Sequence, residues 1–415
     1  MREMKDSGLQ WAGDIPQYWN IAKGKHFMAV LERPVRDDDN VITCFRDGEV
    51  TLRSNRREDG FTVATVEAGY QGIEPGDLVV HGMDGFAGAI GISDSRGKGT
   101  PALNVLSCSE NKKYIMYLLR AMAYTEVFMA LSTGIRVRTC DTNWKKLKSL
   151  DYLIPPADEQ QCIADFLDAK CAEIDALTAD IQTQIDTLEQ YKRSVITETV
   201  TKGLNPNAEM KDSGIQWIGN MPVHWDVVRG KYILHYMQKP VREDDGVITC
   251  FRDGEVTLRS NRREEGFTMS DKEIGYQGID VGDLVVHGMD GFAGSIGISD
   301  SRGKASPVLN VLDTDQCKRY IMYYLRSMAY SDVFLALATG IRVRSCDLRW
   351  NKLAELSYPV PPLDEQNAIV KHIDSVLSKA DAVIADKEAQ LATLDEYKKS
   401  LIFEYVTGKK EVPVS

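Results

Sequence analysis

The sequence lacks the features that mark membrane, secreted and zinc-binding proteins. It contains no run of about 18 apolar residues, the length that a membrane-spanning helix requires, and its first residues do not include the apolar stretch of a signal peptide. We therefore expect a cytoplasmic protein with no membrane partner. Its eight cysteines form no C-x-x-C pair, which predicts reduced thiols rather than disulfides or a zinc site.

Catalytic motifs are missing as well. The sequence contains no P-loop, no Ser-His-Asp pattern and no (N/D)-P-P-(Y/F) string of an amino-methyltransferase. The glycine-rich string HGMDGFAG at 81–88 follows an apolar strand, but it lacks the G-x-G-x-x-G spacing of a dinucleotide loop and continues into residues of β character. We predict a chain that catalyses no reaction and binds no cofactor or metal.

An excess of positive charge is also absent. The net charge of −11 opposes long-range attraction to nucleic acid, which requires a locally positive surface. The composition, 43% hydrophobic and 27% charged, is that of an ordinary folded protein, and 415 residues are enough for two or three domains. Whether the chain binds nucleic acid therefore depends on the local distribution of its charges.

The dominant feature of the sequence is an internal repeat. The strings CFRDGEVTLRSNRRE (44–58), HGMDGFAG (81–88) and GIRVR (134–138) each return 206 residues later. Two copies of 206 residues account for all but three residues, and no insertion separates them. A unit of this length is a pair of domains and not a solenoid repeat, whose period is about 20 to 50 residues.

Each copy begins with a strand-rich part. Short apolar runs bounded by Gly or Asp, such as VITCF, GDLVV and AIGIS, are typical of strands, whereas 112–131 has the spacing of a helix. Two tryptophans and a proline ahead of these runs suggest an N-terminal strap that packs on a neighbouring element. The fold class we predict is α+β, with two mixed α/β domains at 1–156, which includes the strap, and at 205–362.

Each copy ends with a long helix. Neither Gly nor Pro occurs between the Pro-Pro pair and Lys202, and the second copy repeats this pattern, which predicts spacer helices over 157–204 and, with a C-terminal tail, over 363–415. Apolar residues recur at alternating steps of three and four, so we expect the two helices to pair antiparallel as a coiled coil between the domains. The residues expected at this contact are Ile174, Leu177, Ile181, Leu188, Ile373, Val376, Val383 and Leu394.

Three segments of each copy carry the candidate DNA-binding residues. The first, 44–58, holds arginines and an asparagine, which pair with guanine and adenine edges, although acidic neighbours could neutralise them as surface ion pairs. The second, 132–150, is the most basic stretch and predicts an edge strand that contacts the DNA backbone. The third, 81–98, could press main chain and an exposed Phe86 into a DNA groove, or form a hairpin with structural glycines.

The candidate DNA-binding residues of the first copy are Arg46, Arg53, Asn55, Arg56, Arg57, His81, Phe86, Arg96, Lys98, Arg136, Arg138 and Lys145. Those of the second copy are Arg252, Arg259, Asn261, Arg262, Arg263, His287, Phe292, Arg302, Lys304, Arg342, Arg344 and Arg349.

The order of the motifs resembles that of the specificity subunits of type I restriction–modification systems. The resemblance rests on MKDSG-x-Q-W-x-G-x-(I/M)-P-x-x-W at 4–19 and 210–225, the Gly-Asp-Leu-Val-Val strand, the Thr-Gly-Ile-Arg loop, and Pro-Pro-(A/L)-Asp-Glu-Gln leading into a long helix that ends near Val-Thr-x-Gly. It covers the whole chain and both copies.

This resemblance implies two recognition domains at the ends of paired helices, each reading one half of a bipartite site on double-stranded DNA. Two modification subunits would dock on the helices, hold S-adenosylmethionine and methylate adenine, and restriction subunits that cleave DNA could join through that core. The chain itself would hold no cofactor. A stand-alone DNA methyltransferase and a coiled-coil scaffold that binds only protein are the alternatives.

The chain departs from the family pattern in one respect. The two recognition domains of such subunits commonly differ, whereas only three positions between 34 and 62 change in the second copy of this chain. Two equal readers related by a twofold axis must read inverted copies of one short sequence. We therefore predict an interrupted palindrome with a non-specific gap.

Overall fold

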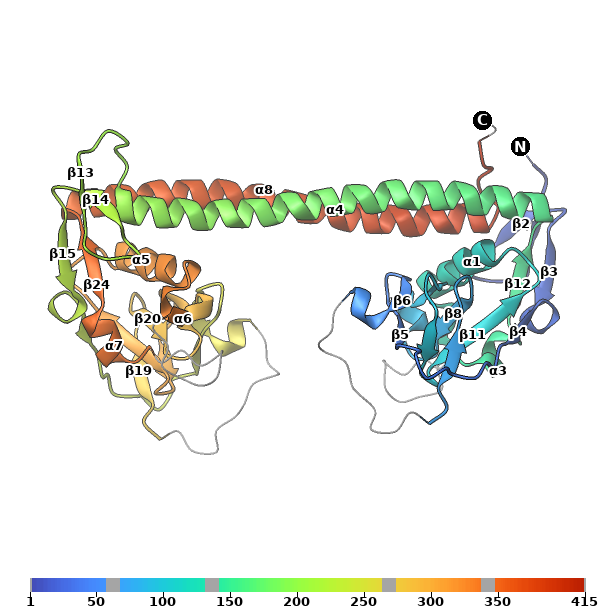
Figure 1. The fold of residues 1–415 in the computed structure, drawn as a ribbon, viewed down its shortest axis with the longest axis horizontal. Coiled ribbons are helices and arrows are strands. Elements are labelled where there is room, and N and C mark those ends of the chain that lie inside the picture. The colour runs from blue at the N-terminus through green and yellow to red at the C-terminus, as the bar shows by residue number, and fades with distance from the viewer. Residues whose placement is uncertain (1, 57–67, 131–141, 263–273, 337–347, 414–415) are drawn as a thin grey trace. The chain divides into compact units, whose positions relative to one another are not determined.

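The structure is a computed structural model that describes residues 2–56, 68–130, 142–262, 274–336 and 348–413. The chain divides into two compact units, the first formed by Met1–Ile181 with Ala389–Ser415 and the second by Gln182–Glu388. Each unit combines the strand-rich part of one copy with a part of each long helix (Figure 1).

The first unit is built from antiparallel strands. Its largest sheet has the order β4-β11-β8-β9, with β4 (Met28–Val30), β11 (Leu103–Cys108), β8 (Leu78–His81) and β9 (Ile90–Ile92). Two-stranded pairs surround this sheet: β1 (Met4–Asp6) with β2 (Asp14–Pro16), β3 (Asn20–Lys23) with β12 (Asp151–Ile154), β5 (Ile42–Cys44) with β6 (Val50–Leu52), and β7 (Gln71–Ile73) with β10 (Gly97–Gly99).

Both faces of the four-stranded sheet are buried. Side chains alternate between the two faces of a strand, so Leu78 and Val80 of β8 pack with helix α1 (Lys112–Tyr124) in one hydrophobic cluster. Val79, which lies between them, packs in a second cluster with Ile42 and Val50 of the β5–β6 hairpin. This burial explains why the Leu-Val-Val part of the GDLVV string is apolar without interruption, and it fixes the hairpin on the sheet.

The helix expected over 112–131 is interrupted. It comprises α1 and the short α2 (Val127–Ala130), because Glu126 between them adopts a left-handed conformation with φ of 60°. The apolar spacing runs on through this break because both helices bury residues in the same core, Phe128 among them. A further short helix, α3 (Trp144–Leu147), precedes β12.

The second unit repeats these elements in the same order. Its sheet has the order β16-β23-β20-β21, with β16 (His235–Tyr236), β23 (Leu309–Asp313), β20 (Leu284–His287) and β21 (Ile296–Ile298). The strand pairs are β13 (Met210–Asp212) with β14 (Asn220–Pro222), β15 (Asp226–Arg229) with β24 (Ser357–Val360), β17 (Ile248–Cys250) with β18 (Val256–Leu258), and β19 (Gln277–Ile279) with β22 (Gly303–Ala305). The helices are α5 (Lys318–Tyr330), α6 (Val333–Ala336) and α7 (Trp350–Glu355).

The long helices α4 (Ala157–Lys202) and α8 (Leu363–Val406) run antiparallel within each unit. In the first unit, Phe166 and Asp175 of α4 contact, respectively, Tyr405 and Lys398 of α8. The second unit shows the same reversal, since Gln184 and Lys192 of α4 contact Lys387 and Asp381 of α8. Both helices lie side by side in Figure 1, with α4 in green and α8 in red.

The stripe between the helices differs from the predicted one at two positions. Leu177 and Val383, which the sequence pattern assigned to the contact, are 48% and 45% exposed, so this assignment was wrong. The stripe runs instead through half-buried Thr178 and buried Ile384, each about 100° further around its helix. The sequence pattern chose Leu177 because it is apolar, whereas the residue that lies on the stripe, Thr178, is polar. The other assigned residues are buried or half-buried: Ile174, Ile181, Leu188, Ile373, Val376 and Leu394.

The motifs that carry the family resemblance form the junction between strands and helices. In the first unit, the indole N–H of buried Trp19 donates to Glu159 near the start of α4 at 2.9 Å. The hydroxyl of Tyr114 in α1 lies 3.2 Å from the carbonyl oxygen of Val406, the last residue of α8. These bonds tie the ends of both long helices to the strand-rich part, and they account for the repeated Trp and Asp-Glu-Gln strings.

The observed fold confirms the α+β class, with mixed helices and strands accompanied by two long helices. The boundaries proposed for the recognition domains stay a prediction. The cysteines in the described ranges are free thiols. Among the helices that the structure describes, none is both long and apolar enough to cross a membrane.

Candidate nucleic-acid interface

A groove in the first unit brings four of the candidate residues together. It has a volume of about 860 Å³ and opens between the β5–β6 hairpin, the turn after β8 and the turn between β10 and β11. Arg46, Arg53, Arg56 and His81 all line it. Two aspartates share the lining with the three arginines, so the groove gathers positive side chains in a chain that is acidic as a whole.

The turn after β8 places Arg46. Gly88 has a φ of 93°, and a Cβ atom at this position would lie 2.8 Å from the carbonyl oxygen of Arg46, so only glycine fits. This close approach holds the β5–β6 hairpin against the turn, and the Arg46 guanidinium lies 2.8 Å from the carboxylate of Asp84. The Arg46 side chain is still 68% exposed, which leaves it free to bind a further partner.

Two threonines of the hairpin orient Arg53 and Asn55. The Nε atom of Arg53 donates to the hydroxyl oxygen of Thr43 at 3.3 Å, and the amide nitrogen of Asn55 donates to that of Thr51 at 2.8 Å. The contact of Asn55 uses one amide donor, so the amide oxygen of this side chain stays available as an acceptor. Both threonines repeat in the second copy, but they are common strand residues, and the sequence alone did not single them out.

Arg56 is the most strongly paired arginine of the groove. Its guanidinium contacts the carboxylate of Asp47 and lies 3.2 Å from that of Glu49, while it stacks 4.3 Å from the ring centroid of Phe45. Acidic neighbours therefore do neutralise this arginine, as the alternative interpretation of the segment expects. The contacts fix the side chain at the rim of the groove.

His81 faces the same groove with its ring held by the chain. Its Nδ1 atom accepts hydrogen bonds from the main-chain N–H groups of Met83 and Asp84, at 3.2 and 3.0 Å. Burial lowers the pKa of His81, and the nearby Arg46 lowers it further, against the opposing effect of the Asp84 carboxylate. The imidazole is therefore neutral near pH 7.

The second unit reproduces these contacts. The Arg252 guanidinium lies 3.1 Å from Asp290, and Asn261 donates to Thr257 at 2.8 Å. The remaining contacts are those of Arg259 with Thr249 at 3.3 Å, Arg262 with Asp253 at 2.6 Å, and Nδ1 of His287 with the N–H groups of Met289 at 3.2 Å and Asp290 at 3.0 Å.

Several residues of the 81–98 segment are structural, contrary to the sequence-based assignment. Phe86 and Phe292 are not exposed but partly buried against the hydrophobic cores of their units. They point inward because the glycine-rich turn folds back over α1 and α5, a placement that the sequence could not indicate. The interpretation of this string as a hairpin with structural glycines is the one the structure supports.

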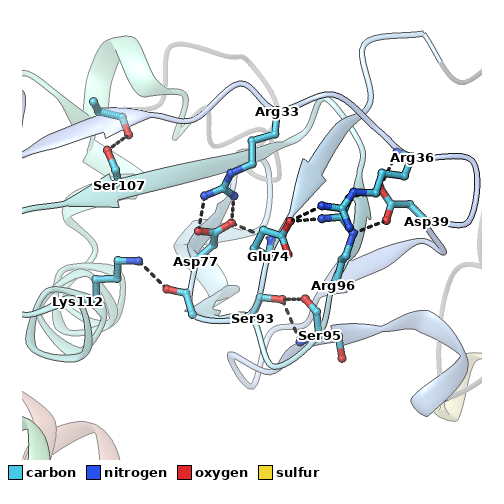
Figure 2. A network of polar contacts seen from close by, with 12 residues as sticks. Arg33, Arg36, Asp39, Glu74, Asp77, Ser93, Ser95, Arg96, Ser107 and Lys112 are labelled. Carbon is cyan, nitrogen blue, oxygen red and sulfur yellow. Dashed lines mark hydrogen bonds and ion pairs between the residues drawn. The ribbon is translucent and has the colours of Figure 1, made fainter.

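Arg96 belongs to an ion-pair network and not to the groove (Figure 2). Its guanidinium donates to Asp39 at 3.0 Å and also contacts Glu74, and the Asp39 side chain is only 2% exposed. Arg302 pairs in the same way with Asp245 at 2.6 Å. The assignment of both arginines to DNA binding is therefore corrected, because their donors already satisfy buried carboxylates. Lys98 and Lys304 lie on the equivalent strands β10 and β22 of the two units and also have partners.

The most basic segment falls largely outside the described residues. Arg136, Arg138, Arg342 and Arg344 of this segment and its repeat, and the edge strand expected there, lie outside the described residues, as do Arg57 and Arg263 of the first segment and its repeat. Lys145 of α3 is exposed and lines a second hollow of about 690 Å³ beside Trp144 and Tyr70. Arg349 is exposed directly ahead of α7.

The sequence analysis missed Met83 at the groove. Its side chain is 57% exposed and lines the groove, and Met289 is 55% exposed at the equivalent position. The signal available in the sequence was a methionine that stands between the same histidine and aspartate in both copies. No group of side chains suited to a metal ion occurs in the described part of the chain.

Comparison with known proteins gives matches along nearly the whole chain. The chain is 24% identical over 444 residues to the putative type I restriction enzyme MjaX specificity subunit of Methanocaldococcus jannaschii, covering 96% of this chain and 95% of that protein. It is 19% identical over 430 residues to the StySPI specificity subunit of Salmonella potsdam, covering 96% and 90%. No protein-family model matches.

A solved structure has the same fold. The chain aligns, with a TM-score of 0.66 and 12% identity, to a chain from a structural study of complex assembly in a type I restriction–modification system, covering 95% of this chain and 99% of that one. The matches in sequence confirm the resemblance that the repeated motifs indicate.

Proposed function

We propose that this chain, a homologue of type I restriction enzyme specificity subunits, recognises a DNA sequence through one groove in each unit. The observation that carries the proposal is the grouping of Arg46, Arg53, Arg56 and His81 around one groove, with Asn55 between Arg53 and Arg56 in the sequence, and the repetition of all five residues 206 positions later. Arginine and asparagine present the donors and acceptors that distinguish guanine and adenine in the major groove.

The near identity of the candidate residues in the two copies supports a particular form of the target. Equal recognition surfaces on two similarly built units read the same short sequence twice, and a twofold relation between the units would invert one copy. The target is then an interrupted palindrome. The paired helices act as the spacer, and the base pairs between the half-sites are not read.

Chemistry on the DNA is assigned to partners. Modification subunits would bind S-adenosylmethionine and methylate an adenine, and restriction subunits would cleave, while this chain supplies recognition without catalysis.

Matching apolar residues of the long helices support two docking sites for the modification subunits. Leu177 and Tyr397 are 48% and 53% exposed in the first unit, and Val383 and Tyr191 are 45% and 51% exposed in the second.

A map of methylated adenines tests the proposal. The chain is co-expressed with the modification subunits of its host in a strain without other adenine methyltransferases, and modified bases are located by sequencing. We expect methylation confined to one interrupted palindrome that disappears when this chain is omitted. Two unrelated half-sites would contradict the palindrome, and methylation that does not depend on the chain would contradict the function.

Two other functions predict different results. A stand-alone methyltransferase would bind S-adenosylmethionine without partners, which equilibrium binding to the purified chain measures. A scaffold that binds only protein would leave the methylated motif unchanged when both grooves are altered. The grouping of Arg46, Arg53 and His81 favours DNA recognition over both.

A further inference from the structure

Each unit contains a histidine whose hydrogen-bonding state is fixed by its own turn. The Nδ1 atom of His81 accepts two main-chain N–H groups, from Met83 and Asp84. An atom that accepts two donors cannot also carry a proton, so the proton of the neutral ring resides on Nε2. His287 is held by Met289 and Asp290 in the same way.

The Nε2 side of the ring is available to a ligand. His81 is half-buried and lines the groove together with Arg46 and Arg53. In the second unit, the nearest carboxylate oxygen of Asp290 lies 3.9 Å from Nε2 of His287, which is beyond hydrogen-bond distance. Within the described residues, the Nε2–H group of each histidine is thus a donor without an acceptor in the chain.

We infer that His81 and His287 are specificity-determining residues, each of which donates its Nε2–H to an acceptor on a base edge of one half-site. This inference rests on the proposed function. In the major groove the possible acceptors are N7 or O6 of guanine, N7 of adenine and O4 of thymine, whereas the N4 amino group of cytosine presents a donor and would be rejected.

The surroundings of the ring favour base reading over phosphate binding. Burial lowers the pKa of both histidines, so a neutral ring offers a directional donor and no positive charge for a phosphate. The exposed Arg46 and Arg252 supply the charge at the same place. A donor fixed by two main-chain bonds loses little conformational freedom on binding, which favours discrimination between bases.

Two substitutions separate base reading from a structural role. In His81→Asn with His287→Asn, the side-chain oxygen takes the position of Nδ1 and keeps the turn, but no group reaches the position of Nε2. In His81→Gln with His287→Gln, the amide reaches the position of Nε2, while the turn N–H groups lose their acceptor. Methylated motifs are mapped for both pairs and for the wild-type chain with modification subunits, and thermal unfolding of each chain is measured.

For the Asn pair we expect the wild-type unfolding midpoint and a motif that becomes degenerate at one position in each half-site, with discrimination there reduced roughly fivefold to tenfold, as for one hydrogen bond. Each single Asn variant should relax one half-site only. The Gln pair should unfold at a lower temperature. An unchanged motif in the Asn pair, or a midpoint lowered as far as in the Gln pair, overturns the inference. A wild-type chain that directs no motif overturns the proposed function instead.

Discussion

The ammonium group of Lys192 in α4 lies 2.6 Å from the carboxylate of Asp381 in α8, and the equivalent residues of the other copy make the same contact. There the two helices exchange roles, since Lys398 of α8 lies 2.6 Å from Asp175 of α4. In each unit the lysine side chain is about four-fifths buried, at 19% and 20% exposed, so both pairs sit at the edge of the apolar stripe. The pairs fix the register of the helices, which apolar contacts alone define less sharply.

This ion pair should contribute measurably to stability. In a double-mutant cycle with Lys192→Ala and Asp381→Ala, we expect a coupling free energy of about 0.5 to 1 kcal/mol, because the lysine is partly buried and the aspartate is exposed. Urea unfolding followed by circular dichroism measures it. The exposed pair of Lys202 and Glu198 is the control, with an expected coupling of about 0.3 kcal/mol. Equal couplings for the two pairs would contradict the assignment of register to Lys192.

The arginines of the two grooves should determine the salt dependence of DNA binding. If Arg46 and Arg252 contact phosphates, replacing both by alanine lowers the slope of log K against log salt concentration by about 0.9 for each. The matched control replaces Lys23 of β3 and Arg229 of β15 by alanine. This double substitution removes the same charge from equivalent strands outside the groove. Titration of labelled target DNA at several salt concentrations measures the slopes. A slope lowered equally by the control would show that net charge, and not the groove, carries the effect.

Shortening the long helices should change the gap and leave the half-sites intact. Deleting 180–186 and 386–392 removes seven residues, or about 10 Å, from each helix while keeping the alternating stripe in phase. We expect the same half-sites separated by about three fewer base pairs, since a base pair rises about 3.4 Å. Methylation mapping reads the gap directly. A deletion of four residues in each helix, which rotates the stripe, should abolish activity, and altered half-sites in the seven-residue variant would contradict the role of the helices as a spacer.

The two groove histidines should make stability depend on pH below neutrality. Their pKa values are lowered in the folded chain, chiefly by burial, so the folded state favours the neutral ring. The histidines therefore make their full contribution to the free energy of unfolding above the unfolded pKa of about 6.5. This contribution is lost as the pH falls through the lower pKa that they have in the folded chain. A proton on Nδ1 would also displace the N–H groups of Met83 and Asp84. Unfolding free energies measured between pH 5 and 8 should show this slope for the wild-type chain and a smaller one for the Asn pair; equal slopes would assign it to other groups.

The sequence by itself determined the organisation of the protein. The repeat at 206 residues predicted two units with the same order of elements, and the absence of Gly and Pro up to Lys202 predicted a helix that the structure ends at that residue. These features depend on local chain geometry: a helix or a strand follows from residues within a few positions of one another, and periodicity records which face is buried. The family resemblance could be read for the same reason, because its strings are contiguous.

Only the tertiary structure decided which polar residues are available to bind DNA. Arg46 and Arg96 look alike in the sequence, but Arg96 is bound to buried Asp39, 57 residues away, while Arg46 lines the groove with a side chain that is 68% exposed. The exposure of Leu177 and the burial of Phe86 likewise depend on packing partners from distant parts of the chain. The donors and acceptors that can bind DNA are those left over after such long-range pairing. This pairing cannot be read from a pattern of neighbouring residues in the sequence.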